Sequence, residues 1–110
     1  MDMSNTKFNV ITCIVQRGKG DDVWKAAQKA GAGGVTVNFA RGMGTREKLG
    51  ILGVAISPEK EVLQLVVPEQ QTDKIYDAVI KAAKLDTPGM GFAFVQEAGR
   101  VVGFYEDKKE

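Results

Sequence analysis

Four Gly-x-Gly triplets are the first residues of this sequence whose type and spacing suggest chemistry. They occupy positions 18–20, 31–33, 42–44 and 89–91. Glycine lets backbone N–H groups approach a ligand closely, and such groups bind phosphate. Each triplet also stands at the end of a predicted element, where glycine serves as a turn or a helix cap. Neither a P-loop nor a G-x-G-x-x-G after a strand is present, so the triplets predict either plain turns or a phosphate site.

The residues that most often perform acid–base or nucleophilic chemistry are nearly absent. The 110 residues contain no His and a single Cys, Cys13. His is the commonest general base and the commonest transition-metal ligand, so we expect no catalytic residue and no metal site. We interpret Cys13 as a small core residue of a protein in a reducing cytoplasm. The sequence therefore favours a sensor or binding module over an enzyme.

The charge balance excludes partners that are recognised by bulk charge. Fifteen Lys and Arg face fourteen Asp and Glu, which gives a net charge of +1. We therefore expect no nucleic-acid partner and no insertion into a membrane. Hydrophobic residues make up 44% and charged residues 26%, which is typical of one globular domain over residues 1–110.

Hydrophobic periodicity divides the chain into the order β-α-β-loop-β-α-β. Strands are predicted over 8–16, 35–41, 61–67 and 92–96, with a short fifth strand at 101–105, and helices over 22–30 and 69–84. Asp21 is the expected N-cap of the first helix, and Gly31 is its expected C-terminal glycine. Residues 42–57 are predicted to form a long mobile loop, and 106–110 a frayed tail. The order predicts an α+β, ferredoxin-like βαββαβ domain with both helices on one face of an antiparallel sheet of order 4-1-3-2.

The predicted strands are apolar on both faces. In the first strand, Phe8, Val10 and Ile14 point one way and Ile11, Cys13 and Val15 point the other. In the third strand, Val62 and Val66 point away from Leu63, Leu65 and Val67. Two helices cover only one face, so we expect a second copy of the chain to cover the other. The triplets at 42–44 and 89–91 then share a rim but lie on opposite edges, about 14 Å apart. A small ligand would be enclosed only where the edges of two copies meet.

Several short stretches together resemble the PII signalling family, nitrogen regulatory protein P-II. They are residues 21–23 (DDV), 34–37 (GVTV), 41–44 (RGMG), 66–68 (VVP), 88–91 (PGMG) and 94–95 (FV). The similarity spans about 9 to 102. It implies a homotrimer with an adenine nucleotide (ATP, ADP or AMP) in three inter-subunit clefts and no covalent cofactor. It also implies a long loop that docks on a regulated transporter, enzyme or regulator.

The resemblance also implies roles for individual residues. By position, the nucleotide cleft would be lined by Ile14, Thr36, Gly42, Gly44, Val67, Gly89 and Gly91. The partner-docking loop would include Met43, Thr45, Arg46, Lys48 and Leu49. We expect Gly89 and Gly91 to serve ligand binding more than folding, because a Cβ at position 91 would crowd a ligand phosphate.

The chain departs from the family where phosphates would be held. Phe92 stands where the family usually has Lys, Met90 replaces an acidic residue, and Gly103 and Tyr105 fall at two Arg positions. A lost charge-assisted contact typically costs about 1.5–3 kcal/mol, so we expect weak ATP binding or a ligand with fewer phosphates. Arg46 falls where the family has a Gln that helps hold Mg²⁺ and 2-oxoglutarate, which argues against 2-oxoglutarate sensing.

Other functions that share the predicted fold stay open as alternatives. An RNA-binding module would need stacking aromatics on its central strands, and residues 61–67 (EVLQLVV) have none. An acylphosphatase-like enzyme would use an Arg to hold a phosphate, and Arg17 is the available residue. A ferredoxin-like small-ligand or metal-tolerance trimer is the third alternative, weakened by the absence of His.

Overall fold

The computed structural model describes residues 6–43 and 58–104 of the chain. The elements are β1 (Phe8–Gln16), α1 (Gly20–Lys29), β2 (Thr36–Arg41), β3 (Glu59–Pro68), the 3₁₀ turn η1 (Glu69–Gln71), α3 (Thr72–Ala83) and β4 (Gly91–Glu97). The sheet has the order β2-β3-β1-β4, and every neighbouring pair is antiparallel. The predicted α+β, ferredoxin-like fold and its strand order are therefore confirmed.

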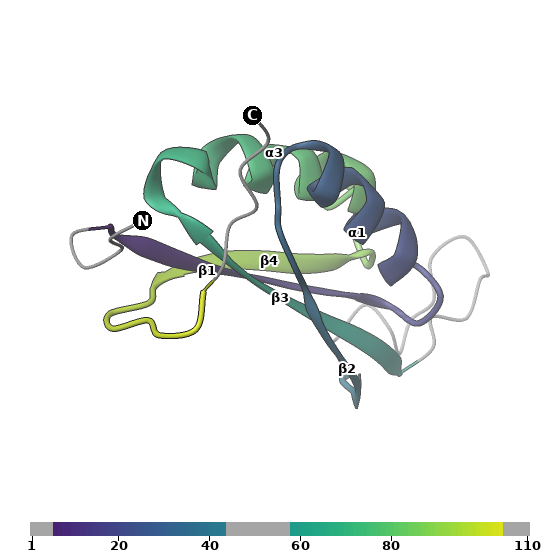
Figure 1. Cartoon of the computed structure of the whole chain (residues 1–110). Helices are drawn as coiled ribbons and strands as arrows, with labels where there is room; N and C mark the ends of the chain where they lie inside the picture. Colours follow the sequence, from purple (N-terminus) through teal and green to yellow (C-terminus); the bar gives the residue numbers. More distant parts are fainter. Residues whose placement is uncertain (1–5, 44–57, 105–110) are drawn as a thin grey trace.

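The two helices lie side by side on one face of the sheet (Figure 1). The residues buried between the layers are Val23, Ala27, Ile75, Val79 and Ala83 from the helices and Ile11, Cys13, Val15, Leu63, Leu65 and Val67 from β1 and β3. Full burial of a Val, Leu or Ile side chain stabilises a fold by about 1.5–3 kcal/mol, so this layer is the main source of stability. The helices therefore cover the face of β1 that carries Ile11, Cys13 and Val15 and the face of β3 that carries Leu63, Leu65 and Val67.

The other face of the sheet, which we call the open face, carries no helix within the described residues (Figure 1). Paired residues of antiparallel strands share a face, so the register assigns its members. They are Phe8, Val10, Thr12, Ile14 and Gln16 of β1, Lys60, Val62, Gln64, Val66 and Pro68 of β3, Thr36, Asn38 and Ala40 of β2, and Phe92, Phe94 and Gln96 of β4. The prediction that β1 and β3 carry apolar residues on both faces is confirmed, although the polar pair Thr12 and Gln64 also lies on the open face.

Both helices begin at residues other than those predicted. α1 starts at Gly20, its N-cap position is Lys19, and no side chain of that position caps it. Asp21 is not the cap and instead forms an exposed ion pair with Lys25 at 3.0 Å. α3 starts at Thr72 because η1 precedes it, and the Thr72 hydroxyl donates to the Pro68 carbonyl oxygen at 3.1 Å.

At the C-terminal side, the predicted glycine of the first helix is confirmed and the fifth strand is not. Gly31 follows the C-cap of α1 and takes φ +118°. Residues 101–104 form no strand, and the ring of Phe104 packs 4.7 Å from that of Phe8. Among the described residues, no helix is long and apolar enough to cross a membrane.

Part of the sequence prediction falls outside the described residues. This applies to the mobile loop from residue 44 onward, to the tail at 106–110, and to Gly44, Thr45, Arg46, Lys48, Leu49 and Tyr105. These positions remain predictions.

Candidate functional site

Two of the Gly-x-Gly triplets flank one rim of the sheet. β2 ends at Arg41, which lies opposite Glu59, and β4 begins at Gly91, which lies opposite Val15. Because β1 and β3 stand between β2 and β4, Gly42 and Gly91 lie at opposite edges of that rim. The arrangement follows the topology predicted for these strands, and among the described residues no strand pairs with the outer edge of β2 or of β4.

The loop before β4 is anchored to the centre of the sheet. The Gln16 side-chain amide donates to the Gly89 carbonyl oxygen at 3.3 Å, and the Met90 N–H donates to the Thr87 carbonyl oxygen at 3.3 Å. Gly89 takes φ +85°, which favours glycine. Within the described residues, the Gly89 N–H donates no hydrogen bond. Of Gly89 and Met90, only Gly89 therefore offers a free backbone donor to a ligand.

Gly42, at the other edge, offers no such donor. Its N–H donates to the Pro58 carbonyl oxygen at 2.9 Å, across the ends of β2 and β3. A Cβ at this position would lie 3.6 Å from Cγ of Lys60, an ordinary contact. The Gly42 backbone therefore holds the end of β2 to the start of β3.

Gly91 is required by the fold. It takes φ +135°, and a Cβ built there would overlap the Ile14 carbonyl oxygen of the neighbouring strand. A side chain at this position would push β4 away from β1. The prediction that Gly91 serves ligand binding more than folding is therefore wrong, because the obstacle to a Cβ is backbone of the same chain.

The three remaining cleft residues that the structure describes lie on two different faces. Ile14 and Thr36 are on the open face, opposite Phe92 and Gln64 respectively. Val67 is 1% exposed and lies in the core beneath the helices. Its neighbour Val66 faces the open side, where it borders a recess of about 270 Å³. That recess is lined by Gly33, Gly34, Val35, Thr36, Gln64, Val66, Gly103 and Phe104.

Sequence reasoning missed an exposed aromatic pair beside the loop before β4. The side chains of Phe92 and Phe94 are 57% and 38% exposed, on the open face of the edge strand. Their rings lie 6.2 Å apart with an interplanar angle of 21°. The signal was available, because two phenylalanines two residues apart in a strand share a face. Together they form a stacked aromatic pair, and Phe92 lies opposite Ile14.

The Arg considered for phosphate binding is already engaged. Arg17 forms an ion pair with Glu59 at 2.6 Å, and its guanidinium lies 5.3 Å above the Phe39 ring. These residues border a recess of about 290 Å³ on the same rim, with Ala40, Arg41 and Lys60. Arg17 is therefore held by contacts within its own chain.

Reactive and metal-binding groups do not gather in the described part of the chain. No group of three or more His, Cys, Asp or Glu that could hold a metal ion occurs among these residues. Cys13 is fully buried, and burial raises the pKa of its thiol to about 11. The thiol is therefore protonated at neutral pH, and it is a poor nucleophile.

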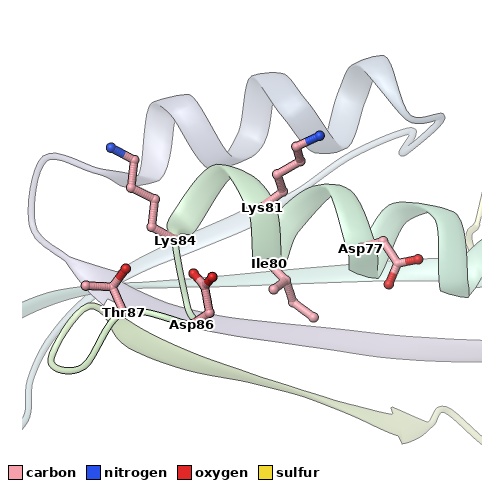
Figure 2. A pocket seen from close by; sticks show the side chains of 6 residues that line it. All are labelled: Asp77, Ile80, Lys81, Lys84, Asp86 and Thr87. Atoms are coloured by element: carbon pink, nitrogen blue, oxygen red, sulfur yellow. The ribbon is translucent and has the colours of Figure 1, made fainter.

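A further recess lies on the helix layer (Figure 2). It has a volume of about 520 Å³ and is lined by Asp77, Ile80, Lys81, Lys84, Asp86 and Thr87. Lys81 and Lys84 extend from the end of the helix, and Asp86 and Thr87 stand on the loop that follows it (Figure 2). Two lysines and two aspartates balance in charge, so the recess offers no net attraction to an anion.

Comparison with known proteins gives one family and a similar solved structure. The family model of nitrogen regulatory protein P-II matches residues 8–108. The crystal structure of Arabidopsis thaliana PII bound to citrate is 26% identical in sequence, with a TM-score of 0.64. The match covers 86% of this chain and 79% of that chain. A comparison with curated proteins finds no match.

Proposed function

Because the chain belongs to the nitrogen regulatory protein P-II family, we propose that it is a regulatory homotrimer that binds an adenine nucleotide between its subunits. Each cleft forms where the β2 edge of one subunit meets the β4 edge of the next. The observation that carries this proposal is the position of Gly42 and Gly89 near one rim, at opposite edges of the sheet. One subunit alone would leave each half of the cleft open to solvent.

The open face supports assembly of several copies. Val10 pairs there with Val66 and Ile14 pairs with Val62, and the polar pair Thr12 and Gln64 stands between them. Apolar side chains on a sheet face that no described helix covers favour association, so a second copy is the natural cover of this face. In this proposal the open face forms most of the interface between subunits, and the rim forms the ligand-binding site.

Within the cleft, we assign contacts to residues that face the open side or the rim. Ile14, Thr36 and Gly89 keep the role that the resemblance implies, as does Gly44. Val66 replaces Val67, because Val67 is 1% exposed in the core and Val66 shares a recess with Thr36. Gly42 and Gly91 shape the backbone at the two edges.

The protein controls a partner, which is a transporter, an enzyme or another regulator. It does so through residues 42–57, which dock on that partner. Met43 begins this segment and is 79% exposed, which suits a docking residue. In this proposal the ligand acts as a signal and is not converted.

Light scattering combined with a thermal-shift panel tests this function. The panel contains AMP, ADP, ATP and citrate, the last because the Arabidopsis protein was crystallised with it. We expect a trimeric mass and saturable stabilisation by at least one adenine nucleotide, because a ligand that binds only the native state raises the melting temperature. A monomer, or stabilisation by citrate alone, would contradict the proposal.

A further inference from the structure

The open face is polar at its centre and apolar on either side. Thr12 of β1 lies opposite Gln64 of β3 at this centre. The neighbouring pairs of the same two strands are apolar, and they are Val10 with Val66 and Ile14 with Val62. A second copy that covers this face would enclose one hydroxyl and one carboxamide among apolar side chains. Polar groups that lose water in this way need hydrogen-bond partners from the protein.

The hydroxyl of Thr12 is already buried in the single subunit and is unpaired there. Thr12 is 4% exposed, although it lies on the face without a helix. Its hydroxyl oxygen has no hydrogen-bond partner among the described residues. Buried hydroxyls of native proteins are nearly always paired, because an unpaired one has lost water without a replacement. A partner for this hydroxyl must come from a side chain that stands directly beside it.

Gln64 is in the position to supply that partner. Residues directly opposite in an antiparallel pair have Cβ atoms about 4.5–5.5 Å apart, so rotation of the Gln64 side chain brings its amide to Thr12. Gln64 is exposed in the single subunit, where water is available to the amide. A carboxamide has an oxygen that accepts and an NH₂ group that donates twice. Once the oxygen accepts from Thr12, the NH₂ group is left to donate away from the sheet.

We propose that Thr12 and Gln64 form a hydrogen-bonded pair that fixes the register in which copies of this chain assemble. The Gln64 amide oxygen accepts from the Thr12 hydroxyl, and the NH₂ group donates to an oxygen of the second copy. The occupant is a second copy because the pair is uncharged and lies between the apolar pairs assigned to the subunit interface. Apolar contacts alone are non-directional, whereas a polar residue in an apolar interface specifies one arrangement. This inference rests on the proposed homotrimer and names the contact that gives it a single register.

Light scattering on dilution, together with native mass spectrometry, tests the pair. Thr12→Val and Gln64→Met each replace a polar group by an apolar group of similar size. Either substitution leaves the other group without its partner, so we expect the trimer to dissociate at a concentration at least tenfold higher. The double variant removes both groups, so it should dissociate within about threefold of the natural concentration. It should also give a mixture of masses in place of a single trimer, because nothing polar selects the register.

Thr12→Ser and Gln70→Met are the controls. Thr12→Ser keeps the hydroxyl and should retain the natural mass and dissociation concentration. Gln70 is exposed in η1, outside the sheet, so Gln70→Met should change neither. Single variants that dissociate as the natural protein does would overturn the inference and keep the proposed trimer. Additive losses in the double variant, or one trimeric mass for it, would do the same. A natural protein that is monomeric at every concentration would overturn both.

Discussion

The Glu61 carboxylate accepts a hydrogen bond from the backbone N–H of Gly20 at 3.2 Å, at the first residue of α1. It also lies 3.4 Å from the Gly18 N–H, and Glu61 is 8% exposed. The first N–H groups of a helix have no partner within the helix, and its N-terminus carries a partial positive charge. A carboxylate of β3 therefore caps α1 and joins the helix to the sheet.

Removal of this cap should destabilise the protein. Glu61→Ala is expected to lower the free energy of unfolding by about 2 kcal/mol, because it leaves the buried N–H of Gly20 without its acceptor. Glu61→Gln should lower it less, since an amide oxygen still accepts a hydrogen bond. Asp21→Ala is the control and should cost at most about 0.5 kcal/mol, because its ion pair with Lys25 is exposed. Urea denaturation measures all three, and equal losses in Asp21→Ala and Glu61→Ala would refute the cap.

The elements that the sequence predicted well are those set by neighbouring residues. β1 has the predicted bounds because β-branched residues make up most of it, and the alternation of Leu63, Leu65 and Val67 indicated a single face. The cap of α1 was missed because Glu61 lies 41 residues beyond Gly20. Asp21, the nearest carboxylate, was the natural but wrong choice.

The candidate site was less predictable, because its residues depend on strand register. The role of Gly91 is visible only once Ile14 is known to lie beside it. A resemblance to a family assigns roles to sequence positions, but it does not show which face of a strand each side chain is on. It therefore implied Val67 as a cleft residue, whereas the neighbouring Val66 is the one that borders the recess. The exposure of Phe92 likewise depends on the absence of a covering element among the described residues.

Gly91→Ala should destabilise the fold by more than about 2 kcal/mol, since it combines a positive φ with overlap of backbone atoms. Gly99→Ala is the matched control. Gly99 also has positive φ, at +73°, but a Cβ there would meet nothing within 4 Å, so only the conformational cost of about 1 kcal/mol remains. Chemical denaturation of both variants checks the difference. Equal losses would show that the Ile14 carbonyl oxygen does not constrain position 91.

Lys84→Gly should stabilise the protein. Lys84 ends α3 in the left-handed conformation with φ 55°, which glycine adopts without steric cost. We expect a gain of about 1 kcal/mol in the free energy of unfolding. Lys81→Gly, one turn earlier in the same helix, should lose about 1 kcal/mol. Opposite signs for the two substitutions in thermal or urea denaturation are the expected result, and a loss in Lys84→Gly would contradict it.

Stability should fall in alkaline solution because of Cys13. Burial raises the pKa of its thiol from 9.0 to about 11 in the folded protein, so the unfolded chain loses this proton first. The contribution of the thiol is therefore fully present below pH 9 and is lost as the pH rises toward 11. Cys13→Ala should flatten the decline in unfolding free energy over this interval relative to the natural protein. Parallel curves for the two proteins between these pH values would rule out Cys13 as the cause.

Assembly through the open face should be abolished by one charge. Val62 lies at its centre, between Ile14 of β1 and Asn38 of β2, so Val62→Asp would bury an unpaired carboxylate in the interface. We expect the natural protein to scatter light as a particle of about three times 11.9 kDa and Val62→Asp to scatter as a monomer.

Val37→Asp is the matched control, because Val37 is 42% exposed on β2 but faces the helix side. Circular dichroism should show a folded chain in each case. A trimer that survives Val62→Asp but dissociates with Val37→Asp would place the interface on the helix side of β2. The cleft would then have to be rebuilt from residues such as Phe39 and Arg41, with Ile14 excluded.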